Sequence, residues 1–154
     1  MESGAQVAGG VIIYPKNFQK EISNLCKKYN VLLVLDEIAT GFGRLGSMNQ
    51  YSQQKSKPDI ISYGKMLTGG YMTLAVTLAT KKIYDSFLGE FNDWKHLFHG
   101  HTFTGNPIAC ALADKNIQMY EKNKLILKIQ KTSKRSEEHT SELQSRPHIS
   151  YAVF

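Results

Sequence analysis

The sequence predicts an α/β fold in which buried strands alternate with helices. The run at residues 31–35 is continuously apolar, as expected of a strand that is buried on both faces of a sheet. Apolar residues at helical spacing precede this run, and a loop that contains Gly41, Gly43 and Gly46 follows it. A helix, a buried strand and a glycine-containing loop in this order are typical of an α/β domain.

Each element has a local signal in the sequence. Residues 2–10 form a loop of small residues, and Pro15 begins a helix that stops near Asn30. Residues 31–35, 60–62 and 71–80 have the β-branched and apolar character of strands. Residues 51–57 are polar and loop-like, and residues 81–97 are less regular. The pair Asn106-Pro107 predicts a helix start, with the asparagine as the N-cap.

Two chemically active residues follow two of these strands. Asp36 ends the first apolar run, and Lys65 comes shortly after the second. Ligands of open α/β sheets bind at the carboxyl ends of the strands, so Asp36 and Lys65 are candidates for one site. An aspartate at this position needs a cation or several donors in order to stay ionised. We therefore expect a positive group to face Asp36.

The surroundings of Lys65 suggest nucleophilic chemistry. The residue lies between Gly64 and the pair Gly69-Gly70, and a desolvated lysine has a lowered pKa. Its neutral amine is then a nucleophile toward carbonyls, as in enzymes that use pyridoxal phosphate. In these enzymes a carboxylate keeps the pyridine nitrogen protonated. Asp36 and Lys65 would fill the two roles.

Three segments carry a family resemblance: DEIATGFGR at 36–44, PDIISYGKMLTGGYMTLA at 58–75 and HGHTFTGNPIACA at 99–111. Together they resemble the class III pyridoxal-phosphate aminotransferases, over about residues 2–128. Ile38-Ala39 and LTGGYMTLA are similar to the branch of this class that acts in biotin biosynthesis. Enzymes of that branch transfer an amino group from S-adenosylmethionine, or in some relatives lysine, to 8-amino-7-oxononanoate.

The resemblance implies a fold and a set of site residues. Residues 1–134 would form the central, incomplete part of the large domain of a fold type I enzyme, whose mostly parallel sheet has seven strands with 71–80 antiparallel. Lys65 would be catalytic, and the cofactor would also contact the following residues: Gln6, Asp36, His101 and Thr102. His101 and Thr102 would reach the cofactor phosphate of the neighbouring subunit in a homodimer. Gly100 and Arg44 would lie near the substrate, although pairing of Arg44 with an acid for structural reasons is equally open.

The same resemblance implies that parts of the enzyme lie outside this chain. The glycine-serine phosphate loop and the ring-stacking aromatic residue of the family would precede it. The small domain, with its arginine for the substrate carboxylate, would follow it. We therefore expect the 154-residue chain to be inactive alone and to aggregate.

Composition excludes several other classes. The net charge is +6 and the pI is near 9.3, but the lysines are scattered without interleaved aromatics, so we expect no nucleic-acid partner. No apolar run approaches the ~20 residues of a membrane span, and the start lacks a signal-peptide pattern, so we expect a cytoplasmic protein with no membrane contact. Cys26 and Cys110 are single and far apart, which indicates reduced thiols.

Alternative functions remain open at this point. His96, His99 and His101 suggest a metal site, but no fourth ligand of matching type lies nearby, and we expect no metal. Asp36-Glu37 after a strand also suits a nucleoside triphosphatase, yet the phosphate-loop motif is missing. A class III aminotransferase acting on an ω-amino acid or ornithine, or a non-catalytic interaction remnant, would fit as well.

The last twenty residues, 135–154, differ from the rest of the chain. They read RSEEHTSELQSRPHISYAVF and show neither a helical period nor similarity to the family. They resemble the conceptual translation of sequencing-library adapter DNA. We therefore expect 135–154 to be a disordered, artefactual tail, which recovery of these codons from genomic DNA would contradict.

Overall fold

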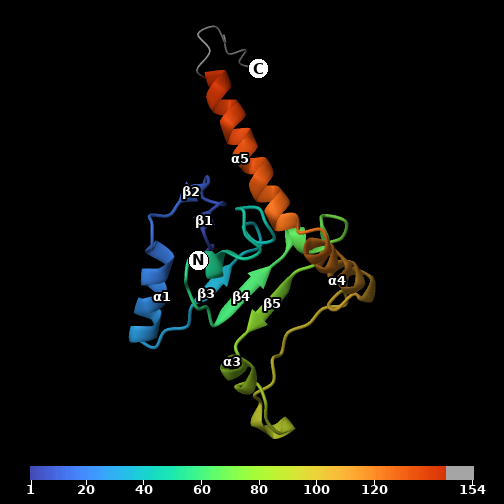
Figure 1. Ribbon diagram of the computed structural model, residues 1–154. Helices are drawn as coiled ribbons and strands as arrows, with labels where there is room; N and C mark the ends of the chain where they lie inside the picture. The colour runs from blue at the N-terminus through green and yellow to red at the C-terminus, as the bar shows by residue number, and fades with distance from the viewer. Residues whose placement is uncertain (145–154) are drawn as a thin grey trace.

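A three-stranded sheet lies at the centre of the computed structural model, which describes the backbone of residues 1–144 and the side chains of residues 1–137 (Figure 1). Its strands are β3 (Val34–Asp36), β4 (Ile60–Tyr63) and β5 (Val76–Ala79), in that spatial order. β3 and β4 are parallel, and β5 runs antiparallel to β4. The predicted strands are confirmed, although each is short and the third begins five residues later than predicted.

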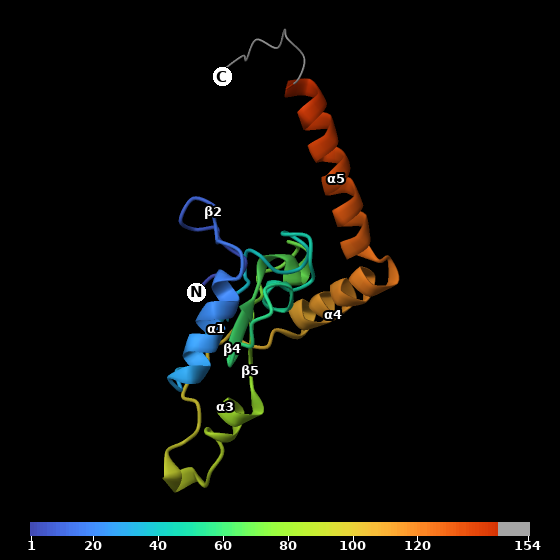
Figure 2. The same ribbon diagram turned by 60° about the vertical axis from the view of Figure 1, so that its left-hand side comes forward.

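Helices flank this sheet on opposite sides, as the two ribbon views agree (Figure 1 and Figure 2). The helix α1 (Phe18–Lys28) packs through Ile22 and Cys26 against the core. On the other side, α4 (Pro107–Lys122) contributes Ala113 and Tyr120. The buried cluster between these elements consists of Leu33, Leu35, Phe42, Ile61, Tyr63, Leu67, Ala113 and Tyr120.

The predicted start of α4 is confirmed. Asn106 Oδ1 accepts hydrogen bonds from the backbone N–H groups of Ile108 and Ala109, at 3.0 and 3.1 Å. Pro107 occupies the first helical position, where its missing N–H costs nothing. The local sequence therefore determines where this helix begins.

Two segments predicted as loops contain regular structure. Within residues 2–10, β1 (Ala5–Gln6) pairs with β2 (Ile12–Ile13) in a hairpin whose turn uses the left-handed backbone of Gly10. The short helix α2 (Gln50–Gln53) overlaps residues 51–57. It forms because the Glu37 carboxylate accepts hydrogen bonds from the N–H groups at its start. That capping group lies 13 residues earlier in the chain, so no local pattern could reveal it.

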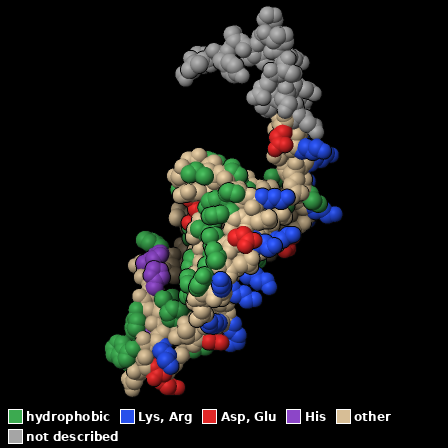
Figure 3. Space-filling view, turned by 90° about the vertical axis from the view of Figure 1, so that its left-hand side faces the viewer, with side chains coloured by type: hydrophobic (Ala, Val, Ile, Leu, Met, Phe, Trp, Pro, Cys, Tyr) green, Lys and Arg blue, Asp and Glu red, His purple; other side chains and the backbone are tan. Residues whose placement is uncertain are grey.

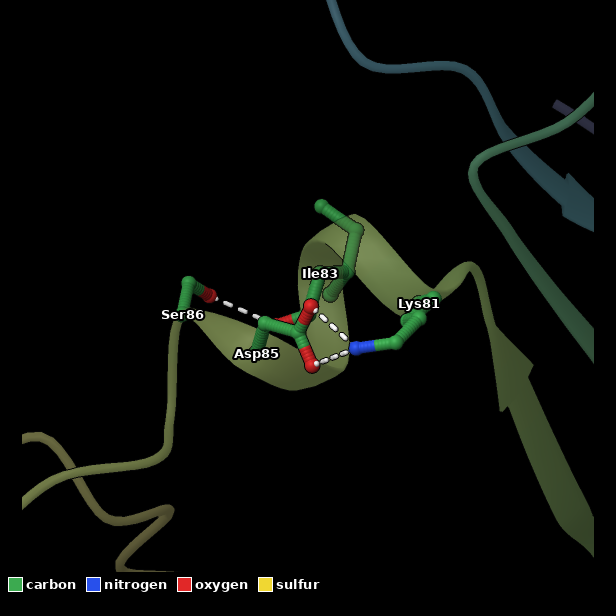
Figure 4. A network of polar contacts seen from close by, with 4 residues as sticks. All are labelled: Lys81, Ile83, Asp85 and Ser86. Carbon is green, nitrogen blue, oxygen red and sulfur yellow. Dashed lines mark hydrogen bonds and ion pairs between the residues drawn. The ribbon is translucent and has the colours of Figure 1, made fainter.

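The less regular segment at residues 81–97 contains only short helices. These are α3 (Lys81–Asp85) and the 3₁₀ turn η2 (Phe91–Asp93), and loops connect them. Figure 4 shows the polar contacts of α3: Lys81 Nζ lies 2.6 Å from an oxygen of Asp85, and the Ser86 hydroxyl donates to the Ile83 carbonyl. All of these bonds span four residues or fewer.

The prediction of an irregular tail is wrong for residues 135–144. They continue α5 (Leu125–Gln144), which extends away from the sheet in both views (Figure 1 and Figure 2). The segment contains neither proline nor glycine, and its glutamate, leucine and glutamine residues favour helix. Residues 145–154 of the predicted tail lie outside the described residues.

No helix in the described part of the chain is both long and apolar enough to cross a bilayer.

Candidate active site

Asp36 is the last residue of β3, and Lys65 follows the end of β4, the strand that pairs with β3 in parallel. In the register of β3 and β4, Asp36 lies opposite Ser62, three residues before Lys65. The backbone turns immediately after Tyr63: Gly64 precedes η1 (Lys65–Thr68), a single 3₁₀ turn. The predicted convergence of an acid and a lysine at one sheet edge is therefore present in this chain.

Asp36 is half-buried and bound only to backbone. Its Oδ1 accepts a hydrogen bond from the Ile38 N–H at 2.8 Å. Among the described residues it forms no ion pair, so the positive group that we expected to face it is not a side chain of this part of the chain. A half-buried carboxylate of this kind matches the protonated nitrogen of a pyridine ring.

Lys65 is exposed, so the expected desolvation is wrong for this structure. It lies at the start of η1, beyond the end of β4. Its backbone φ of 43° is left-handed, a strained conformation for a residue with a side chain. Strain of this type concentrates at functional positions, where surrounding contacts hold it in place.

Glu37, adjacent to Asp36, is completely buried. Its two carboxylate oxygens accept from the backbone N–H groups of Gln50 and Tyr51, at 2.8 and 2.6 Å. Burial of the Tyr63 phenol raises its pKa, and the Glu37 charge raises it further. Glu37 thus fixes the loop between β3 and α2.

The amino-terminal segment runs beside β3 and brings Gln6 to the same edge. Asp36 N–H donates to the Met1 carbonyl and Ser3 N–H donates to the Asp36 carbonyl, at 2.8 and 2.9 Å. Gln6 itself is exposed, and its side chain folds over Gly9 of its own hairpin. The structure therefore places Gln6 near the end of β3 and shows no contact between its amide and Asp36.

Sequence reasoning missed the residue that holds this segment, Gln19. Its side chain is fully buried, its Nε2 donates to the hydroxyls of Ser3 and Ser56 at 2.9 and 2.7 Å, and its Oε1 accepts from the Gly4 N–H. A polar residue at an apolar position of the helical stripe was the available signal.

Thr40 was also missed: its Oγ1 is the only buried side-chain polar atom without a hydrogen-bond partner among the described residues.

The other predicted site residues lie away from this edge or on exposed loops. Arg44 is exposed in the loop after β3. Burial raises the pKa of the Tyr120 phenol, and the Arg44 charge partly offsets this rise. Gly100, His101 and Thr102 are all exposed. His101 N–H donates to Thr104 Oγ1 at 3.2 Å, and His101 Nδ1 accepts from the Phe103 N–H at 3.2 Å. Among the described residues, the hydrogen bonds of His101 therefore stay within its own loop.

One histidine of this loop, His96, contacts aromatic rings. His96 stacks on Phe91 with ring centroids 5.8 Å apart and lies 4.2 Å from the Phe98 ring. Figure 3 shows histidine side chains beside hydrophobic ones on this face of the molecule. Among the described residues, no three His, Cys, Asp or Glu side chains are placed to hold a metal ion.

Comparison with known proteins identifies the family. The family described as Aminotransferase class-III matches residues 1–152. This chain belongs to the class III aminotransferases. That membership rules out the nucleoside-triphosphatase alternative and agrees with the α/β fold and the strand-end lysine. The match also extends beyond residue 128, where the resemblance noted from the sequence ended.

Individual relatives show which members of this family the chain resembles. The adenosylmethionine-8-amino-7-oxononanoate aminotransferase of Staphylococcus aureus is 46% identical over 97% of this chain, which covers 33% of that protein. The crystal structure of the Methanocaldococcus jannaschii protein of the same name has a TM-score of 0.85 at 41% identity, with coverage of 97% and 35%. Plasmodium yoelii ornithine aminotransferase has a TM-score of 0.69 at 34% identity, with coverage of 81% and 31%. The chain thus spans about a third of the length of the curated relatives it matches.

Proposed function

We propose that this chain is the lysine-bearing part of a pyridoxal-phosphate aminotransferase, with residues 1–134 in the large domain. The complete enzyme would transfer an amino group to 8-amino-7-oxononanoate and form 7,8-diaminononanoate, a step of biotin biosynthesis. The observation that carries the proposal is the placement of Asp36 and Lys65 at the ends of two paired parallel strands. The similarity to enzymes named for this substrate supports the choice of substrate.

The residues at the strand ends suit the cofactor. Pyridoxal phosphate, when bound, supplies an aldehyde and an electron-withdrawing ring. Asp36 lacks a cationic partner among the described residues and would hold a proton on the ring nitrogen through its free oxygen. Lys65 would bind the aldehyde through Nζ and then use that amine to take a proton from the substrate carbon and return it. The exposed position of Lys65 leaves this amine open to a ligand.

The phosphate and substrate contacts require a second subunit in this proposal. His101 and Thr102 are exposed, and the hydrogen bonds of His101 to other described residues stay within its loop, so both residues would be free to reach the cofactor phosphate of a partner. The Thr102 hydroxyl and the loop N–H groups would donate to it. Gly100 would lie beside the substrate, Arg44 would hold an anionic group of it, and Gln6 would contact the ring. The working enzyme would accordingly be a cytoplasmic homodimer.

The 154-residue chain alone should not turn over. Its sheet has three strands where the family expectation is seven, and the exposed hydrophobic side chains of β3 and β5 lack covering elements. A site with this little enclosure cannot hold the cofactor in one geometry. Steady turnover by the purified chain would contradict this part of the proposal.

A second candidate keeps the chemistry and changes the substrate. The likeness to ornithine aminotransferase, at a TM-score of 0.69 and 34% identity, covers 81% of this chain. Asp36 and Lys65 serve the amino transfer itself and therefore do not select between substrates. An aminotransferase for ornithine or an ω-amino acid is the alternative.

The decisive assay uses the enzyme encoded by the complete reading frame. We expect 7,8-diaminononanoate from 8-amino-7-oxononanoate when S-adenosylmethionine or lysine is the donor, and the productive donor is thereby identified. Lys65→Ala should abolish the product, whereas Lys82→Ala, at an exposed lysine of α3, should not. No product with either donor, in a protein that binds pyridoxal phosphate, would favour the ornithine or ω-amino acid alternative.

A further inference from the structure

Asn116, on α4, contacts the backbone of the turn that carries Lys65. Its Nδ2 donates to the Met66 carbonyl at 2.7 Å and to the Leu67 carbonyl at 3.1 Å. The two bonds join segments that are 50 and 49 residues apart in the sequence. They use both hydrogens of the amide, so this contact depends on the asparagine donor itself.

The turn that receives these bonds is short and strained. η1 contains four residues, and Lys65, the first, has a left-handed φ of 43°. Within the turn, Leu67 N–H donates to the Gly64 carbonyl at 2.9 Å and Gly69 N–H donates to the Met66 carbonyl at 3.1 Å. Such a conformation persists only when neighbouring contacts determine it.

Two sets of contacts hold this turn. Leu67 and Thr68 are buried, at 5% and 1% exposure, and anchor the turn to the core. Asn116 fixes its carbonyls from the opposite element, α4. The direction in which the Lys65 backbone leaves β4 therefore depends on α4 as well as on the sheet.

We propose that Asn116 is a positioning residue for Lys65. By binding two consecutive carbonyls of η1, it would keep the Lys65 amine at the edge of the sheet beside Asp36. The structural part of this inference stands on the hydrogen bonds alone, whereas its effect on catalysis rests on the proposed function. An alternative is that Asn116 only fills space between α4 and η1.

Two substitutions separate these roles. Asn116→Ala removes both donors. Asn116→Asp keeps the size and shape but places carboxylate oxygens against two carbonyl oxygens, which repel them. A space-filling role predicts that Asn116→Asp is harmless, whereas a positioning role predicts that it is at least as damaging as Asn116→Ala. Gln118→Ala is the matched control, because the Gln118 amide lies on the same helix but donates to Asp114 Oδ2 within it, at 2.8 Å.

The first readout is amide hydrogen exchange in the complete enzyme. We expect exchange at Leu67 and Gly69 to accelerate by on the order of tenfold in both Asn116 variants and to stay unchanged in Gln118→Ala. The second readout is steady-state kinetics. A misplaced amine should lower kcat by about ten- to a hundredfold and leave KM nearly unchanged.

The outcomes distinguish this inference from the proposed function. Unchanged exchange and unchanged kcat in Asn116→Asp, in an enzyme that turns over, would overturn the positioning role and leave the function intact. Faster exchange at Leu67 and Gly69 in a protein whose wild type shows no transamination would support the positioning of the turn and contradict the function.

Discussion

Around Asp36 and Lys65, hydrogen bonds join parts of the chain that are far apart in sequence, whereas in the loop of residues 87–105 they join close neighbours. Ser3, Gln50 and Asn116 each bond to the first region from another element. In the loop, His101 bonds within three residues and Phe91, Trp94, Phe98 and Phe103 are each at least 70% exposed. We call these the strand-end region and the aromatic loop.

This difference indicates which site residues the chain can place by itself. Asp36 and Lys65 are positioned by elements that all lie within residues 1–122. Three predicted site residues, Gly100, His101 and Thr102, match the family in sequence. Among the described residues, they have no structural partner in the strand-end region. Under the proposed function, that partner is the second subunit.

The largest expected difference between the two regions is in how much a core substitution and a loop substitution change the free energy of unfolding. Leu35 is fully buried, so Leu35→Ala leaves a cavity and should lower the free energy of unfolding by about 2–5 kcal/mol. Phe98→Ala in the aromatic loop removes a ring that is 70% exposed and should change it by less than about 0.5 kcal/mol. Urea denaturation measures both; equal losses would show that the loop packs on the core.

Glu37→Gln should have the next largest effect. The substitution replaces a buried carboxylate, which accepts two hydrogen bonds, by an amide. The NH₂ group of this amide then faces a backbone N–H group and cannot accept a hydrogen bond from it. We expect a loss of about 1–3 kcal/mol in the same denaturation experiment. Glu21→Gln, at an exposed position of α1, is the control and should be nearly neutral. A neutral Glu37→Gln would mean that the start of α2 does not depend on this carboxylate.

Alkaline pH should destabilise the strand-end region through Tyr63. Burial, reinforced by the Glu37 charge, raises the pKa of its phenol above the ordinary value of 10.0. The unfolded chain therefore loses this proton first, so the stabilisation is complete below about pH 10 and falls above it by up to about 1.4 kcal/mol per pH unit. Tyr63→Phe should flatten this part of the pH profile of unfolding. An unchanged slope would assign the loss to other groups.

The smallest effect belongs to the ion pair of α3 (Figure 4). Lys81 and Asp85 are close, but their side chains are 84% and 44% exposed. The lysine also lies at the amino-terminal end of the helix, the less favourable orientation. Lys81→Ala should cost no more than about 0.5 kcal/mol and should become neutral in high salt. A loss that salt does not reduce would indicate packing of the lysine stem.

The sequence predicted the elements whose signals are local. The apolar run before Asp36, the antiparallel strand after Gly70 and the cap at Asn106 all appear in the structure. The placement of Asp36 and Lys65 at the carboxyl ends of neighbouring strands was also predictable, because parallel strands end on the same side of a sheet. The family resemblance, confirmed by the match over residues 1–152, added the chemistry.

Two of the failures have a common cause in contacts between distant residues. The helix α2 depends on Glu37, and the position of η1 depends on Asn116, which no pattern of spacing reveals. The exposure of Lys65 was not predictable either, because flanking glycines indicate a turn and do not show which side of it is covered. Residues 135–144 are helical through the propensity of their residues, without the apolar stripe on which the sequence prediction of helices depends.

The most direct test of the central claim is to locate the lysine that binds the cofactor. The complete enzyme is incubated with pyridoxal phosphate and reduced with borohydride, and the modified peptide is identified by mass spectrometry. We predict a phosphopyridoxyl group on Lys65 in the wild type and greatly reduced labelling in Asp36→Asn. Labelling of another lysine, with Lys65 unmodified, would contradict the assignment of the strand-end region as the active site.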